Sequence, residues 1–224
     1  MEKPLLKSIC LRLTYKVLFR PVLKFFVGVQ YPDCSFLKDE KQFVIIANHN
    51  SHLDTLSLLT SLPGEILWKV KPVAAEDYFG NTKLKAKLSN FFINTLLINR
   101  HSKREDGANY SMNRMLKAID DGYSLILFPE GSRGEPEQMS KMKSGIARLL
   151  VQKPGLKYVP VFMTGMGTSL PKGGVLILPY NATLHFGKPT LPESDDPHTI
   201  MDQIEKDFGA MVEKYGIKDD DDDE

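Results

Sequence analysis

A histidine and an aspartate, His49 and Asp54, stand five residues apart in the string Asn-His-Asn-Ser-His-Leu-Asp. A histidine beside a carboxylate can act as a general base: it takes a proton from a hydroxyl, while the carboxylate fixes the ring tautomer and stabilises the imidazolium. The apolar run at 43–47, directly before this string, is rich in β-branched residues and predicts a buried strand. Side chains that follow such a strand lie at the edge of an open α/β sheet where active sites form.

The spacing of His49 and Asp54 restricts how the two side chains can meet. Positions five apart in one helix point about 140° away from each other, because a turn takes about 3.6 residues. The pair therefore meets only if His49 precedes the helix and Asp54 lies in its first turn. Ser51 followed three residues later by Asp54 has the form of a capping box, so Ser51 is a suitable N-cap. The alternative is that Asp54 only caps a helix and His49 is a polar loop residue.

A second string, Phe-Pro-Glu-Gly-Ser-Arg-Gly at 128–134, also follows an apolar run. Backbone N–H groups of such a turn can bind an oxyanion or a phosphate, and an arginine can hold a phosphate through two parallel hydrogen bonds. The spacing is not that of a nucleophile elbow. An ordinary turn with a surface arginine is the alternative. The candidate substrate-binding residues, including two cations from neighbouring stretches, are Arg100, Glu130, Gly131, Ser132, Arg133 and Lys143.

The composition is that of a globular protein of 224 residues, enough for one domain with a full core. The formal charge is +1, but 219–224 are all acidic, so the rest of the chain carries 29 basic residues against 28 less six, or 22, acidic ones, a balance of +7. A body of that sign can approach anionic lipid or a phosphorylated substrate. A mildly basic soluble enzyme with a solvated tail is the alternative. Two cysteines make neither a disulfide framework nor a zinc site, which favours a reducing, cytosolic setting.

The N-terminal segment, 5–29, mixes leucine, valine and phenylalanine with five Lys or Arg residues and contains no acidic residue. Cations at this frequency exclude a spanning helix, and the cleavage pattern of a signal peptide is missing. Apolar bulk beside basic residues is typical of a helix that lies in the plane of a membrane interface. A helix packed on its own domain is the alternative. Pro21 is expected to kink this helix or to split it in two.

Strand-like and helix-like stretches alternate after residue 30, which predicts an α/β layered fold with a largely parallel sheet flanked by helices. We divide the chain into an amphipathic, interfacial helical segment at 1–29, a main domain at 30–218 and a disordered acidic tail at 219–224. The expected strands lie at 43–47, 67–75 (broken by Pro72), 96–99, 124–128, 158–163, 175–177 and 182–186, and the expected helices at 51–62, 77–92, 104–120, 141–152 and 197–215.

Taken together, the motifs resemble the glycerolipid acyltransferase family, in particular the 1-acylglycerol-3-phosphate acyltransferases. Four sequence blocks follow in the family's order, and the resemblance covers roughly residues 20–190. The blocks are N-H-x-S-x-x-D at 48–54, an arginine that ends a short apolar strand at 97–100, F-P-E-G-[ST]-R at 128–133 and V-P-V at 159–161, with a basic-x-G element at 143–145 and Leu-Pro-Lys-Gly at 170–173.

This resemblance implies an O-acyltransferase of phospholipid biosynthesis, with the main domain as the acyltransferase domain. His49, held by Asp54, would deprotonate the free hydroxyl of a lysophospholipid, above all 1-acyl-sn-glycerol-3-phosphate. That oxygen would attack the thioester of acyl-CoA or acyl-carrier protein and give phosphatidate. Arg133, Arg100 and the backbone at 130–131 would bind the phosphate or the developing charge. The resemblance implies no metal, no bound cofactor and no nucleic-acid partner, and it implies a peripheral, monotopic place on the cytoplasmic face of a membrane.

Two departures from the family pattern leave the acceptor open. The family often carries a lysine beside a glutamate where this chain reads Ala74-Ala75-Glu76, and the second block has Asn94 near its usual glycine. That lysine is associated with phosphate binding, so another lysophospholipid or a lyso-aminolipid is an alternative acceptor. Two other classes also remain: a soluble thioesterase or hydrolase that uses the same pair with water, and a non-catalytic module that binds a lipid surface.

Overall fold

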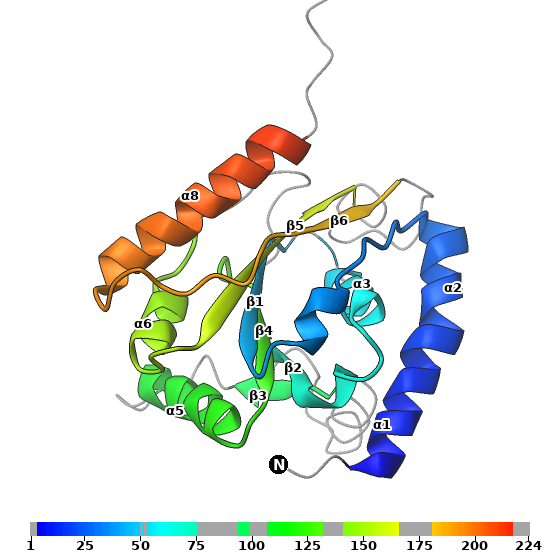
Figure 1. The fold of residues 1–224 in the computed structure, drawn as a ribbon, viewed down its shortest axis with the longest axis horizontal. Coiled ribbons are helices and arrows are strands. Elements are labelled where there is room, and N and C mark those ends of the chain that lie inside the picture. The colour runs from blue at the N-terminus through cyan, green and yellow to red at the C-terminus, as the bar shows by residue number, and fades with distance from the viewer. Residues whose placement is uncertain are drawn as a thin grey trace, which may run out of the picture.

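A six-stranded sheet forms the centre of the fold, with helices on both faces (Figure 1). The computed structural model describes residues 4–49, 51, 53–75, 94–98, 107–131, 141–165 and 181–216. The strand order is β3-β2-β4-β1-β5-β6; β6 is antiparallel to β5, and the other described neighbours are parallel. The strands are β1 (Phe43–Ala47), β2 (Val70–Ala75), β3 (Leu96–Ile98), β4 (Ser124–Leu127), β5 (Lys157–Thr164) and β6 (Thr183–Phe186).

The described helices include two long ones, α5 and α8, and an N-terminal helix built from four consecutive segments. Those four segments are α1 (Leu5–Arg12), the π-helical η1 (Leu13–Phe19), α2 (Arg20–Val22) and the π-helical η2 (Leu23–Val27). The others are the 3₁₀ turns η3 (Ser35–Lys38) and η4 (Leu67–Lys69) and the α-helices α3 (Asp54–Ser61), α5 (Gly107–Asp120), α6 (Gly145–Val151) and α8 (Pro197–Tyr215).

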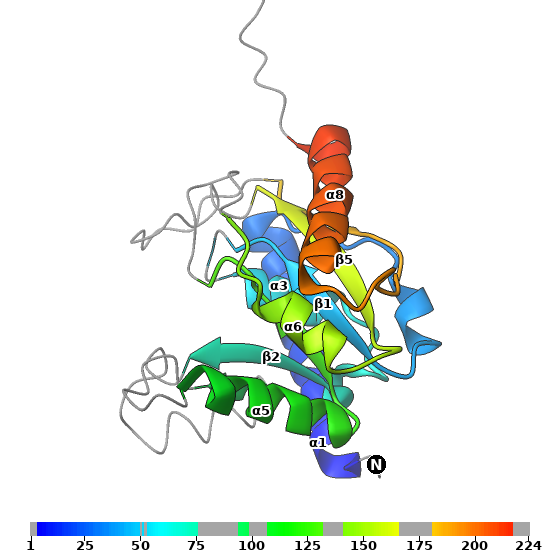
Figure 2. The ribbon, with the colours of Figure 1, turned by 90° about the vertical axis from the view of Figure 1, so that its left-hand side faces the viewer.

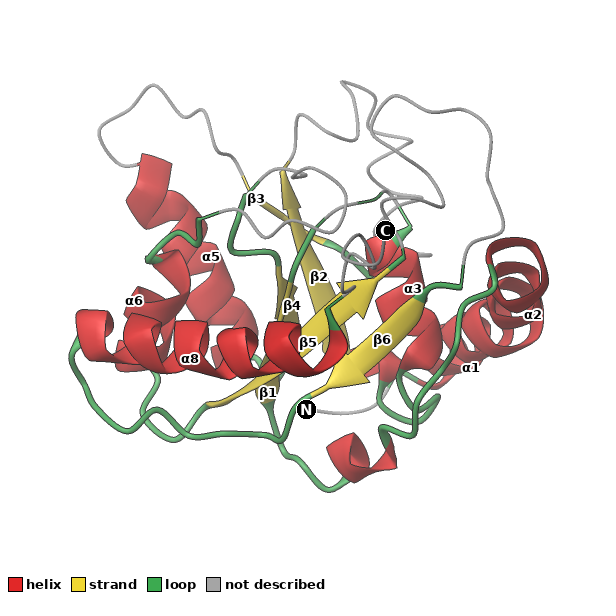
Figure 3. Ribbon diagram, turned by 90° about the horizontal axis from the view of Figure 1, so that it is seen from above, coloured by secondary structure: helices red, strands yellow, loops and turns green. Residues whose placement is uncertain are grey.

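Strand β1 lies inside the sheet, and all five of its side chains are buried. Successive side chains of a strand point to opposite faces, so Phe43, Ile45 and Ala47 enter one core. Val44 and Ile46 enter the core on the other face. The N-terminal helix and α3 cover the first face, and α5, α6 and α8 cover the second (Figures 2 and 3). The predicted α/β layered fold with a largely parallel sheet is therefore confirmed.

The predicted elements match the structure with small differences at their ends. β1 and α8 have the predicted bounds. Helix α6 begins at Gly145 rather than at Lys141, because the chain before it runs along the turn after β4, where the N–H of Lys143 donates to the carbonyl of Pro129 at 3.0 Å. The expected helix at 77–92, the expected strand at 175–177 and the acidic tail at 219–224 lie outside the described residues.

The sequence predicted that Pro72 breaks its strand, and this prediction is wrong. β2 runs without interruption from Val70 to Ala75. Its first half pairs with β4 and its second half with β3, so Pro72 lies where the strand changes partners. Proline cannot donate a backbone hydrogen bond, and a change of partner is a place where a strand can do without one.

Pro21 does not split the N-terminal helix either. The four helical segments follow one another without a gap from Leu5 to Val27, and Gly28, with a φ of 78°, ends the helix. The N–H of Arg20 bonds to the carbonyl of Tyr15, five residues back, so the chain around Pro21 is wound more widely than an α-helix. A proline that lacks an N–H is tolerated at such a change of hydrogen-bond pattern.

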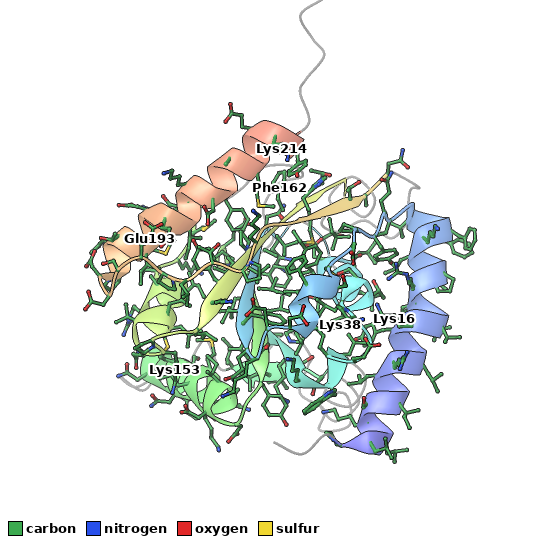
Figure 4. All side chains as sticks on the ribbon, in the orientation of Figure 1. Lys16, Lys38, Lys153, Phe162, Glu193 and Lys214 are labelled. Atoms are coloured by element: carbon green, nitrogen blue, oxygen red, sulfur yellow. The ribbon has the colours of Figure 1, made fainter. Side chains whose placement is uncertain are left out.

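The polar face of the N-terminal helix is turned toward the domain. The ammonium of Lys7 donates to Oδ1 of Asn94 at 2.6 Å. Lys16 donates to the carbonyl of Thr60 at 2.7 Å, and Arg20 donates to the same carbonyl at 3.2 Å. Thr60 belongs to the last turn of α3, where unpaired carbonyls favour cations. Figure 4 shows Lys16 on the side of the helix that faces α3, and burial lowers the pKa of Lys16 to about 8.

The opposite face of the N-terminal helix is apolar and exposed. A four-residue step overshoots one α-helical turn by about 40°, so an apolar stripe with this spacing would wind around a uniform α-helix. The wider π-helical segments counteract that drift and keep the stripe on one side. The exposed apolar residues of this face are Leu5, Leu6, Ile9, Leu13, Val17, Leu18, Val22, Phe25 and Phe26.

Candidate active site

Two turns, one after β1 and one after β4, share an edge of the sheet. β1 and β4 are parallel neighbours, with Ile46 opposite Leu127. The residues that follow them, from Asn48 and from Phe128, therefore meet at the carboxyl-terminal edge, where open α/β sheets bind their ligands. The described residues of the two strings that the sequence singled out, at 48–54 and 128–131, come together here.

His49 and Asp54 are in direct contact within this edge. Nδ1 of His49 lies 2.9 Å from Oδ2 of Asp54. His49 follows β1, and Asp54 is the first residue of α3, so the geometry derived from their spacing is confirmed. The Asp54 side chain is fully buried, whereas that of His49 is 22% exposed. The carboxylate is thus shielded from water, while the imidazole can be reached from outside.

The start of α3 differs from the predicted capping box. The helix begins at Asp54 rather than at Ser51, and Leu53 holds the N-cap position. Oδ2 of Asp54 accepts the N–H of Ser51 at 2.8 Å, and the carbonyl of Ser51 accepts the N–H of Asp54 at 3.3 Å. These two bonds close a turn before the helix, which delays its first residue. Asp54 therefore closes the turn before the helix and also binds His49, two roles that the sequence analysis had treated as alternatives.

Further contacts hold His49 from the β4 side. Its backbone N–H donates to Oε1 of Glu130 at 2.8 Å. Its ring stacks on that of Phe128, with centroids 4.3 Å apart and planes inclined by 26°. The sequence placed Glu130 among the substrate-binding residues, but it gave no sign that the Glu130 carboxylate binds the backbone of His49 or that Phe128 supports the ring.

Asn48 fixes the same turn to β5 and was missed by sequence reasoning. Its Oδ1 accepts the N–H of Met163 at 2.7 Å, and its Nδ2 donates to the carbonyl of Met163 at 2.8 Å. The two residues stand 115 positions apart. The one sequence signal for this contact was an amide side chain directly after a predicted strand. The buried side chain of Asn48 thus aligns the ends of β1 and β5.

We expect Asn48→Ala to lower the free energy of unfolding by roughly 1–3 kcal/mol, because two buried backbone groups of Met163 lose their partner. Denaturant unfolding measures this loss. Asn113→Ala, at an exposed position of α5, is the matched control and should change little. Equal stabilities of the two variants would mean that the contact with Met163 contributes nothing.

Lys143 approaches the turn after β4. Gly131 has a φ of 77°, and a Cβ placed there would collide with Nζ of Lys143. The ammonium therefore lies against the backbone face of Gly131, which only glycine leaves open. The structure brings together His49, Asp54, Glu130, Gly131 and Lys143 among the predicted site residues. Arg100, Ser132 and Arg133 lie outside the described residues.

Among the described residues, no group of three or more His, Cys, Asp or Glu side chains could hold a metal ion. The contact of His49 with Asp54, beside the backbone of Gly131 and the ammonium of Lys143, can supply a general base next to groups that bind an anion.

Comparison with known proteins connects this arrangement to a family. A family model described as Acyltransferase matches residues 29–164, a stretch that contains both turns. The chain belongs to the acyltransferase family. The resemblance of its four sequence blocks to glycerolipid acyltransferases is thereby confirmed.

Similar proteins within the family carry one recurrent name. The 1-acyl-sn-glycerol-3-phosphate acyltransferase of Limnanthes douglasii is 23% identical over 188 residues, which are 80% of this chain and 59% of that protein. The protein of the same name from Helicobacter pylori is 28% identical over 122 residues, 54% of this chain and 47% of that protein. This chain thus spans about half the length of the curated relatives that it matches.

A solved structure has the same fold. The crystal structure of the 1-acyl-sn-glycerophosphate acyltransferase PlsC from Thermotoga maritima matches with a TM-score of 0.68, covering 94% of this chain and 95% of that one. The sequences are 16% identical, so this likeness concerns the fold.

Proposed function

We propose that this chain transfers a fatty acyl group from acyl-CoA or acyl-carrier protein to the free hydroxyl of a lysophospholipid, with 1-acyl-sn-glycerol-3-phosphate as acceptor and phosphatidate as product. The observation that carries the proposal is the 2.9 Å contact between His49 and Asp54 at the sheet edge of an acyltransferase-family chain. The names of similar proteins support the choice of acceptor.

His49 is the general base in this proposal. Asp54 holds Nδ1, so Nε2 takes the proton of the acceptor hydroxyl. The hydroxyl oxygen attacks the thioester carbonyl and forms the new ester bond, while the carbon–sulfur bond breaks. The imidazolium then returns its proton to the leaving thiolate, and His49 is again neutral. The buried carboxylate of Asp54 stabilises the imidazolium between these two steps.

The test is an acyl-transfer assay with purified protein. Acyl-CoA is supplied with and without lysophosphatidate in detergent, and free thiol and phosphatidate are measured. We expect thiol release that depends on the acceptor, with one phosphatidate formed per thiol. Thiol release that is equal without acceptor would instead identify a thioesterase. A panel of lysophospholipids and lyso-aminolipids, each with acyl-CoA and acyl-carrier protein, then ranks acceptors and donors.

We assign the acceptor phosphate to the cations around the turn after β4. Lys143 supports this assignment, because its ammonium lies against Gly131 and close to the residues that hold His49. It offers a positive charge in a chain that has alanines where the family often carries a lysine, at Ala74 and Ala75. Arg100 and Arg133 are proposed as further phosphate ligands on their sequence positions alone.

Lys143→Ala is expected to raise the apparent KM for lysophosphatidate by about tenfold or more, because a charge-assisted hydrogen bond contributes about 1.5–3 kcal/mol. The KM for acyl-CoA should change less. Lys206→Ala, at an exposed position of α8, is the matched control. Initial rates at varied acceptor and donor concentrations separate the two constants, and equal changes in both would remove Lys143 from the head-group site.

We also propose that the enzyme works as a peripheral protein on the cytoplasmic face of a membrane, with its N-terminal helix in the interface. The exposed apolar face from Leu5 to Phe26 supports a lipid partner, since soluble proteins rarely expose a contiguous apolar surface of this kind. None of the described helices is long and apolar enough to cross a bilayer. The contacts of Lys16 and Arg20 with α3 would hold the site at a fixed place relative to the lipid.

A further inference from the structure

Glu130 is a buried carboxylate at the candidate active site, with 4% of its surface exposed. Its Oε1 accepts the backbone N–H of His49 at 2.8 Å. The two residues stand 81 positions apart, so the bond ties the turn after β4 to the turn after β1. Burying a carboxylate costs free energy unless hydrogen bonds compensate for the lost water. A carboxylate buried at this place therefore needs hydrogen-bond partners, and the N–H of His49 is one of them.

The bond to Glu130 acts on the backbone of His49. Asp54 holds the ring at Nδ1, and Phe128 packs against the ring face. Neither contact fixes the backbone from which the ring extends. Asn48 fixes the preceding residue to β5, and Glu130 fixes the N–H of His49 itself. With the backbone and ring both fixed, Nε2 has one place relative to a bound hydroxyl.

The charge of Glu130 speaks against a direct role in binding the substrates of the proposed reaction. Both the lysophosphatidate head group and the phosphates of CoA are anionic, and a carboxylate repels them. A carboxylate is, however, a strong acceptor for a backbone N–H. The 2.8 Å bond shows that the reach and direction of the Glu130 oxygen suit it to hold the N–H of His49.

We propose that Glu130 is a positioning residue: its carboxylate oxygen sets the place of the general base by holding the backbone N–H of His49. This inference rests on the proposed acyl transfer with His49 as the base. A displacement of about 1 Å in a catalytic group can cost about 10²-fold in rate. Loss of the oxygen should thus lower kcat strongly, whereas the KM for lysophosphatidate should change little.

Two conservative variants separate position from charge. Glu130→Gln keeps the length of the side chain and an acceptor oxygen but removes the charge. Glu130→Asp keeps the charge but is one methylene shorter, so its oxygen no longer reaches the N–H of His49. If position matters, Glu130→Asp should lose about 10²-fold in kcat and Glu130→Gln clearly less. If charge matters, the order should be reversed. The exposed Glu205 of α8, changed to Gln and to Asp, is the matched control.

The assay is acyl-CoA with lysophosphatidate in detergent, with kcat, both KM values and the pH profile of kcat measured for each variant. Circular dichroism and thermal unfolding establish that each variant is folded. A lower kcat for Glu130→Gln than for Glu130→Asp, or a rise in the KM for lysophosphatidate with kcat unchanged, overturns the inference. His49→Ala distinguishes the two proposals. An active His49→Ala enzyme contradicts the proposed mechanism. An inactive His49→Ala enzyme, together with a larger loss of kcat in Glu130→Gln than in Glu130→Asp, contradicts only the role of Glu130.

Discussion

His49→Ala is expected to lower the rate of acyl transfer by about 10²- to 10⁴-fold, the usual contribution of a general base. The fold should survive, because the His49 side chain is partly exposed and its removal leaves Asp54 bound to the N–H of Ser51. The KM values for acceptor and donor should change much less than kcat, since in this mechanism the imidazole acts on the proton of the hydroxyl.

Asp54→Asn provides the companion measurement. The asparagine has the same shape, but its amide can present an N–H to Nδ1 of His49 and so favour the wrong tautomer. Because Asp54 is fully buried and also accepts the N–H of Ser51, thermal unfolding must accompany the kinetics. We expect a loss in kcat of at least about 10²-fold in folded protein. Near wild-type transfer by folded His49→Ala would falsify the base mechanism, and near wild-type transfer by Asp54→Asn would remove Asp54 from it.

The parts of this fold that could be predicted from the sequence are those set by local patterns. β1 and α8 have their predicted bounds because β1 is an unbroken apolar run and α8 is a long stretch with helical periodicity, and both have clear ends. The contact between His49 and Asp54 could also be predicted, because helix geometry allows these positions to meet in only one way.

Contacts between turns that are far apart in the sequence could not be predicted. Neither the bond from the N–H of His49 to Glu130 nor the two bonds between Asn48 and Met163 leave a trace in the spacing of residues. Each depends on which strands are neighbours, and strand order in a parallel sheet is set by packing over the whole domain. Proline gave misleading signals for a related reason: Pro72 and Pro21 lie where the hydrogen-bond pattern changes, which no local pattern reveals.

The N-terminal helix shows how an amphipathic pattern can be recognised while its orientation is missed. Mixed apolar and basic residues predicted a helix with one face toward lipid, and the alternative was a helix packed on the domain. Packing on the domain is confirmed, since Leu11, Tyr15 and Leu23 are buried against it, whereas contact of the exposed apolar face with lipid stays a prediction. The sequence suggested basic residues available to anionic lipid, but Lys7, Lys16 and Arg20 bind groups of the domain instead. The end of α3 provides the carbonyl that attracts two of them.

This orientation determines how the membrane proposal is best tested. Deleting the segment would uncover the core that Leu11, Tyr15 and Leu23 help to close, so loss of binding could reflect unfolding. The outward face can be changed without that risk. Phe25 and Phe26 are 79% and 66% exposed, and serine at both positions should leave thermal unfolding unchanged. Leu191→Ser with Val212→Ser, at exposed apolar positions outside this helix, is the matched control.

Phe25→Ser with Phe26→Ser is expected to weaken binding to liposomes by more than about tenfold, because burying one phenylalanine in an apolar phase is worth about 1.5–3 kcal/mol. Cosedimentation with vesicles measures this. Transfer activity should fall on vesicle-borne lysophosphatidate and persist on detergent-dispersed substrate. Since four of the five cations of the segment contact the domain, binding should depend only weakly on anionic lipid and on salt. Equal pelleting of the variant and the control would place the lipid-binding surface elsewhere on the protein.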